Sequence, residues 1–128
     1  MKLLLDTHTL IWAVDQPSLL GPQAKSALED LANSLLLSAA TIWEIAIKVG
    51  VNKLTLSLPY RQWMTRAMND LGVTILPVTV EYAGVQATLP FHHRDPFDRL
   101  LIAQALVENI PLVSNDALFE QYGISRVW

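Results

Sequence analysis

Short apolar runs alternate along the chain with longer stretches in which apolar residues recur every three or four positions. An apolar run of about four residues that ends in polar residues is typical of a buried β-strand. Such runs lie at residues 2–5, 34–37, 73–76 and 110–113, with a weaker edge candidate at 125–127. Helical spacing predicts helices at 8–14, 22–31, 39–49, 60–71, 80–89, 96–107 and, in short form, 117–122. The alternation predicts an α/β fold with three layers, α/β/α, around a short, mostly parallel central sheet.

Length and composition favour one globular domain that spans residues 1–128. Hydrophobic residues make up 52% of the chain and charged residues only 16%, which leaves apolar surface for a partner. No apolar run approaches the 18 residues that a membrane span needs, so no membrane association is expected. The charge of Asp6 comes too early for a signal peptide, and we expect a cytoplasmic protein.

The chain contains no cysteine, which excludes disulfides, thiolate metal sites and cysteine nucleophiles. Oxygen and imidazole groups remain for chemistry. The net charge of −3 argues against nucleic-acid binding through overall positive charge alone. If several acids share one pocket, however, the rest of the surface is modestly basic.

The stretch from His92 to Ala105 joins a polar loop to a helix that is apolar on almost every face. Asp95 has the sequence position of an N-cap, and Pro96 that of the first helical residue. Asp98 falls in the first turn, where a carboxylate faces unpaired N–H groups. One interpretation is that both aspartates only cap the helix. The other is that the buried helix presents an acid to a site.

Three further acids have related positions in the predicted sheet. Asp6 directly follows the first strand, Asp116 nearly directly follows the fourth, and Glu44 lies about two turns beyond the second. Ligands bind at the carboxyl edge of such sheets, so the four acids Asp6, Glu44, Asp98 and Asp116 can converge there. The alternatives are strand-end caps for Asp6 and Asp116, and a solvated ion pair with Lys48 for Glu44.

A cluster of carboxylates is unfavourable by itself, because like charges at about 4 Å repel by roughly 4 kcal/mol at an effective dielectric of about 20. A divalent cation bound between the carboxylates turns this net repulsion into attraction. Magnesium prefers carboxylate and water oxygens and commonly serves phosphoryl chemistry, where it stabilises negative charge and lowers the pKa of water. The cluster therefore favours metal-dependent phosphodiester hydrolysis.

Two other magnesium-binding classes fit the sequence less well. A receiver-like domain has paired acids after its first strand and a lysine after its last, whereas no lysine follows Lys53 here. A phosphatase of the haloacid dehalogenase type needs Asp-x-Asp-x-Thr, and this chain reads Asp-Thr-His-Thr from Asp6. A catalytically inactive binding or regulatory module that retains the acidic pocket remains an alternative.

The motifs together resemble a known family across nearly the whole chain. They are Leu-Leu-Leu-Asp-Thr-His ending at His8, Trp-Glu-Ile around Glu44 with Lys48 and Lys53-Leu54, the block from His92 to Ala105, and Ser114-Asn115-Asp116. This combination resembles PIN-domain ribonucleases of the VapC toxin type, from type II toxin–antitoxin pairs. The resemblance implies an RNA substrate, magnesium or manganese held by Asp6, Glu44, Asp98 and Asp116 as catalytic residues, and a cognate antitoxin that blocks the site.

Several residues beside the four acids have two candidate roles. Asp95 is explained by capping, with direct metal ligation as the less favoured role. The three histidines, His8, His92 and His93, lack zinc-type spacing with any cysteine, and contact with phosphate is the favoured role. For Arg94 and Arg99, RNA phosphates and neighbouring carboxylates are equally favoured partners. Thr7 and Asn115 are candidate hydrogen-bond partners of the acids.

The tryptophans at helical apolar positions favour core or interface packing over base stacking. Low charge, with large apolar residues on two predicted helices, leaves more apolar surface than a small monomer usually exposes. We therefore expect a homodimer as well as the antitoxin, through a surface that includes Trp43, Trp63, Met64 and Met68.

Overall fold

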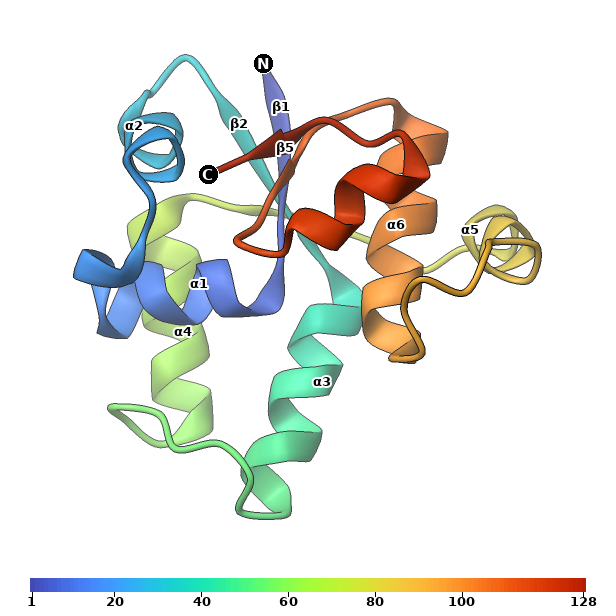
Figure 1. Cartoon of the computed structure of the whole chain (residues 1–128). Coiled ribbons are helices and arrows are strands. Elements are labelled where there is room, and N and C mark those ends of the chain that lie inside the picture. The colour runs from blue at the N-terminus through green and yellow to red at the C-terminus, as the bar shows by residue number, and fades with distance from the viewer.

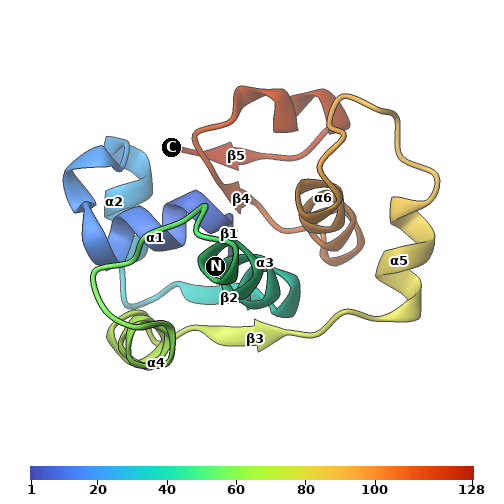
Figure 2. The same ribbon diagram turned by 90° about the horizontal axis from the view of Figure 1, so that it is seen from below.

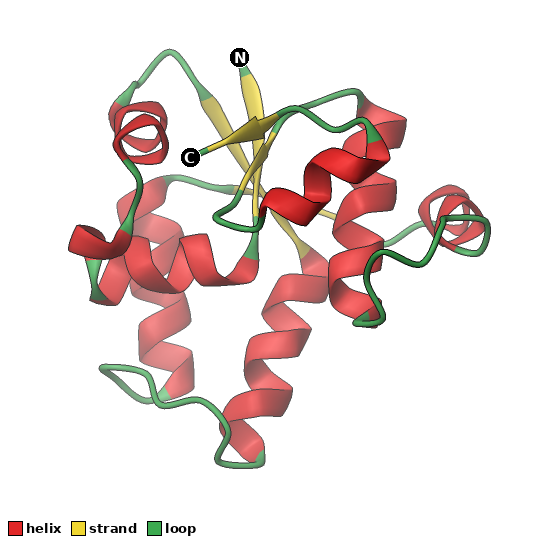
Figure 3. Cartoon of the chain, viewed as in Figure 1, coloured by secondary structure: helices red, strands yellow, loops and turns green.

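The computed structural model describes residues 1–128, and it contains one five-stranded sheet flanked by helices (Figures 1 and 3). All four strand pairings are parallel, in the order β3-β2-β1-β4-β5. The strands are β1 (Lys2–Leu5), β2 (Ser34–Ser38), β3 (Thr74–Leu76), β4 (Leu112–Val113) and β5 (Arg126–Val127). The structure confirms the predicted α/β fold with a short parallel sheet.

Six α-helices and two 3₁₀ helices connect the strands. They are α1 (Thr7–Asp15), η1 (Pro17–Leu19), α2 (Pro22–Glu29), α3 (Ala39–Gly50), α4 (Tyr60–Leu71), α5 (Val80–Gln86), α6 (Pro96–Glu108) and η2 (Ala117–Tyr122). None of them combines the length and hydrophobicity that a bilayer crossing requires.

The central strand β1 divides the core into two halves. Side chains alternate along a strand, so Leu3 and Leu5 pack with α1, α2 and α4, while Leu4 packs on the other face with α6. The view along the sheet in Figure 2 shows these two groups of helices on opposite sides of it. Helix α6 is buried continuously from Arg99 to Ala105, as its apolar sequence predicts.

Helix α3 begins directly where β2 ends and extends away from the carboxyl edge of the sheet (Figure 1). Ser38 caps it by accepting a hydrogen bond from the Ala40 N–H at 3.1 Å. The first turn of α6 also lies near this edge, and α3 and α6 contact each other. The carboxyl edge of β1 therefore lies close to the starts of α1, α3 and α6.

The boundaries differ from the sequence expectation at a few positions. Helix α2 ends at Glu29 rather than Leu31, and β4 contains only Leu112 and Val113. Gly50 is the last residue of α3 and does not end it in a left-handed conformation; Asn52 takes that conformation two residues later. Asparagine tolerates positive φ better than most residues, which explains the shift of the turn.

Candidate active site

Asp6 lies at the carboxyl end of the central strand and is buried. Its Oδ1 accepts the Thr9 N–H at 2.8 Å, so the side chain caps α1. Its Oδ2 accepts the Ser114 hydroxyl at 2.5 Å. Because β1 and β4 are neighbours, this bond joins the ends of two strands that are more than 100 residues apart in sequence. The predicted cap is confirmed, and it leaves Asp6 at the carboxyl edge.

Glu44 reaches back from α3 to the residue that follows Asp6. Its Oε1 accepts the Thr7 hydroxyl at 2.5 Å, and its Oε2 pairs with the Lys48 ammonium at 2.5 Å. The ion pair of the alternative interpretation therefore exists. It is not a solvated one, because Glu44 is only 4% exposed. A buried carboxylate needs such partners, and Thr7 and Lys48 provide them.

Asp98 lies in the first turn of α6, just after the N-cap Asp95, whose Oδ1 accepts the N–H groups of Phe97 and Asp98. The pKa of Asp98 is raised to about 7, mainly by burial; the negative charges of Asp95, Glu44 and Asp6 contribute to the rise, while His93 opposes it. Asp98 is therefore close enough to Asp6 and Glu44 to interact with both.

Lys48 belongs to the same group of charges. Its hydrogen bond with Glu44 is the largest cause that raises its pKa; burial opposes the rise, and the charges of Glu44, Asp95 and Asp98 add to it. Its side chain remains about one-third exposed. Lys48 is thus a positive group between the buried acids and the solvent.

Asp116 joins this group indirectly. It caps η2 by accepting the Leu118 N–H at 3.0 Å, and its other oxygen contacts His93 Nε2 at 2.7 Å. Its own N–H donates to the Ser114 hydroxyl at 3.0 Å, the same hydroxyl that donates to Asp6. Ser114 and His93 therefore connect Asp116 to the acids near β1 and α6.

The four acids match a hard divalent cation in the type of donor that they offer, since all are carboxylates. The charges of Asp6 and Glu44 repel that of Asp98 and contribute to its raised pKa. No three side chains of histidine, aspartate or glutamate lie close enough to enclose an ion as they stand. Each of Asp6, Glu44 and Asp116 instead accepts hydrogen bonds from the protein.

Arg99 corrects one sequence expectation. Its guanidinium donates to four backbone carbonyls, those of Gln86, Leu89, Pro90 and His93, at 3.0–3.3 Å. The ring of Phe91 covers it at 4.0 Å, and the residue is only 5% exposed. Both proposed roles, RNA phosphate contact and pairing with a carboxylate, are wrong for Arg99. It anchors the loop before α6, whereas Arg94 remains exposed.

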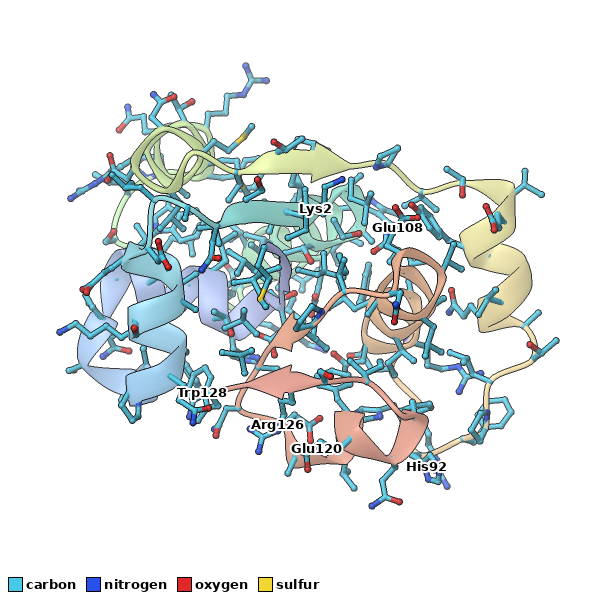
Figure 4. All side chains as sticks on the ribbon, turned by 90° about the horizontal axis from the view of Figure 1, so that it is seen from above. Lys2, His92, Glu108, Glu120, Arg126 and Trp128 are labelled. Atoms are coloured by element: carbon cyan, nitrogen blue, oxygen red, sulfur yellow. The ribbon has the colours of Figure 1, made fainter.

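The histidines also separate into two kinds. His93 is buried against Phe119 and Tyr122, so contact with phosphate is wrong for it. His8 and His92 are exposed, and Figure 4 shows His92 at the rim of the molecule. Contact with phosphate remains a hypothesis for these two.

Ser114 is a hydrogen-bond partner of the acids that was not expected from the sequence. Thr7 is confirmed as a partner of an acid, but Ser114 rather than the exposed Asn115 has the second such role. Arg126 donates to the Ser114 carbonyl at 3.1 Å and pairs with Glu120, which lies beside it in Figure 4. The available signal was a small hydroxyl residue directly after a buried strand.

The chain matches the PIN domain family over residues 3–124, and it belongs to that family. It is 29% identical over 114 residues to Ribonuclease VapC22 of Mycobacterium tuberculosis, a stretch that covers 88% of this chain and 85% of that protein. The resemblance to VapC-type proteins is thereby confirmed.

Solved structures share the fold at low sequence identity. The VapBC2 complex of Rickettsia felis, bound to a DNA fragment from its promoter, has a chain with a TM-score of 0.72 and 20% identity over the full length of both chains. VapBC-1 of nontypeable Haemophilus influenzae has a TM-score of 0.66 and 18% identity, with 98% of this chain and 96% of that one covered. These likenesses confirm a PIN-like fold.

Proposed function

We propose that this protein is a metal-dependent endoribonuclease, the toxin component of a toxin–antitoxin pair. Membership of the PIN domain family, the relative named Ribonuclease VapC22 and the VapBC complexes among the structural neighbours support this function. The observation that supports it most directly is the raised pKa of Asp98 beside Asp6 and Glu44. An acid whose pKa is strongly raised by burial and by neighbouring carboxylates is typical of a catalytic centre.

Asp6, Glu44, Asp98 and Asp116 are the residues that would hold magnesium or manganese. When bound, such an ion neutralises charge on the scissile phosphate and makes water a better nucleophile. The hydroxyls of Ser114 and Thr7 orient the carboxylates of Asp6 and Glu44 for this role. The Lys48 ammonium, partly exposed beside Glu44, is placed to attract the phosphate of an approaching RNA.

The partners follow from the same family relationship. The structural neighbours are named as VapBC complexes, so we infer a cognate antitoxin for this chain as well. A homodimer is supported by an exposed apolar stripe along α3 and its C-cap, which consists of Trp43, Ile47 and Val51 at intervals of four residues. The cytoplasm, where RNA is available, is the expected compartment.

The nuclease activity is tested with purified protein and a labelled single-stranded RNA. We expect cleavage with magnesium or manganese, loss of cleavage in excess EDTA, and at least a 100-fold loss in Asp6→Asn without unfolding. Glu29→Gln is the matched control, because Glu29 is exposed on α2, outside the acid group. Undiminished cleavage in EDTA or in Asp6→Asn would overturn the proposal. No cleavage under any condition would favour the inactive binding module.

A further inference from the structure

His93 is the one histidine with a buried ring, and the helix that contacts it is the helix that Asp116 caps. Its imidazole stacks on Phe119, with ring centroids 4.6 Å apart and planes 10° from parallel. The ring of Tyr122 packs beside it at 5.5 Å. Because Phe119 and Tyr122 both belong to η2, the imidazole and the Asp116 carboxylate are held by the same short element.

The hydrogen bonds of this ring determine which nitrogen carries its proton. The His93 backbone N–H donates to the Tyr122 hydroxyl oxygen at 2.8 Å, and Nδ1 of the same residue lies 3.1 Å from that oxygen. If the Tyr122 hydroxyl donates its own proton to Nδ1, this hydroxyl and both ring nitrogens of His93 all have hydrogen-bond partners. The remaining nitrogen, Nε2, then has the N–H and donates it to Asp116 Oδ2 at 2.7 Å.

The backbone of His93 is held by a residue of α6. Arg99, which is buried in α6, donates to the His93 carbonyl at 3.3 Å. His93 also lies two residues before Asp95, the N-cap of α6. His93 therefore connects the start of α6, where Asp98 lies, with the start of η2, where Asp116 lies.

We propose that His93 is a positioning residue: its Nε2–H orients the Asp116 carboxylate and holds it beside the acids of β1, α3 and α6. Without this donor, the half-exposed Asp116 carboxylate keeps only the cap hydrogen bond from the Leu118 N–H to Oδ1, and its other oxygen has no partner that fixes its direction. Loss of such an outer hydrogen bond typically lowers the affinity of a metal site about 10–100-fold. The expected change in metal affinity rests on the proposed function. The role of His93 in orienting Asp116 does not, because it follows from their hydrogen bond alone.

The first test measures binding of Mn²⁺ alone, from the electron paramagnetic resonance signal of the free ion, without RNA or turnover. We expect about a 10-fold weaker Kd in His93→Leu. His93→Gln should retain most of the affinity, because its side-chain amide can donate near the position of Nε2. His92→Leu is the matched control and should bind as the wild type does.

Equal losses of Mn²⁺ affinity in the Leu and Gln variants would overturn the positioning role, and so would wild-type affinity in a folded His93→Leu.

A second readout needs no metal. Side-chain ¹⁵N NMR of the metal-free protein at pH 8 should show the His93 proton on Nε2, with mixed tautomers in Tyr122→Phe. A proton on Nδ1 in the wild type would contradict the positioning role of His93, whether or not the protein binds Mn²⁺. If the wild type binds no Mn²⁺ at all, that result counts against the proposed nuclease instead.

Discussion

Asp98 has two surroundings with opposite effects on its charge. As a first-turn residue of α6 it faces unpaired N–H groups, an arrangement that stabilises a carboxylate by about 0.3–1 kcal/mol. Burial and the charges of Asp95, Glu44 and Asp6 act in the other direction. The pKa of about 7 shows that desolvation and repulsion outweigh the helix. The ionised form of Asp98 is therefore unfavourable in the folded protein at neutral pH when no cation is present.

This imbalance predicts how stability depends on pH. An aspartate in the unfolded chain ionises near pH 4, whereas folded Asp98 ionises near pH 7, so the folded state binds the extra proton between these values. The metal-free protein should lose stability as pH rises through this window. After allowance for solvent screening, Asp98→Asn should stabilise it by about 1–2 kcal/mol at pH 8 and by almost nothing at pH 4.

Urea denaturation in EDTA at the two pH values measures the difference, with Glu29→Gln as the control at an exposed acid. Magnesium at about ten times its Kd should add roughly 1.4 kcal/mol to the wild type and clearly less to Asp98→Asn. A loss of more than about 1 kcal/mol in Asp98→Asn at pH 8 would instead show that the helix start needs this charge.

At the scale of elements, the sequence predicted most starts and ends because caps are local. Asp95 caps α6 and Asp6 caps α1, as their sequence positions indicate, and Ser38 and Thr79 accept an N–H in the same way at the starts of α3 and α5. The partners of the site were less predictable, because they depend on contacts between distant segments. Nothing near Arg99 in sequence indicates that its guanidinium meets one carbonyl at the end of α5 and three in the loop that follows. That Ser114 rather than Asn115 donates to Asp6 likewise depends on how β4 ends beside β1.

The loop that Arg99 anchors provides an element-scale prediction. Arg99→Met keeps the apolar stem but removes five donors from a buried position, and the loop carbonyls lose their partners. We expect a loss of about 2–4 kcal/mol in the free energy of unfolding and faster amide exchange around His93. Arg94→Met, at an exposed position of the same loop, should change stability by less than about 0.5 kcal/mol. Equal effects of the two substitutions would contradict the anchoring role.

At the scale of the whole molecule, the apolar surface is smaller than the sequence suggested. Trp63 and Met64 are buried under α1 and β2, and Met68 is partly buried, so three of the four residues expected at the interface belong to the core. Trp43 is 65% exposed and lies beside a cavity of about 450 Å³ between α3, α5 and α6. The structure thus restricts the expected surface to the stripe on α3 and its surroundings.

We expect the wild type to be a dimer at tens of micromolar and Trp43→Arg to be a monomer with unchanged thermal stability. A charge in the centre of an apolar interface opposes association, because it would be buried without a partner. Leu31→Arg is the matched control, since Leu31 is 99% exposed and lies far from the stripe in sequence. Light scattering coupled to size exclusion measures the mass. A monomeric wild type, or a dimer of Trp43→Arg, would contradict this assignment.

The position of β1 in the middle of the sheet determines when the site can form during translation. Asp6 directly follows β1, which pairs with β4, and its hydrogen-bond partner Ser114 is synthesised more than 100 residues later. At roughly 5–20 residues per second, the two are separated by several seconds. A nascent chain that ends before β4 contains Asp6, Glu44 and Asp98 but lacks the strand that pairs with β1 and the hydroxyl that bonds Asp6. Under the proposed function, the acid cluster of this nuclease is therefore completed only after β4 and Ser114 have been synthesised.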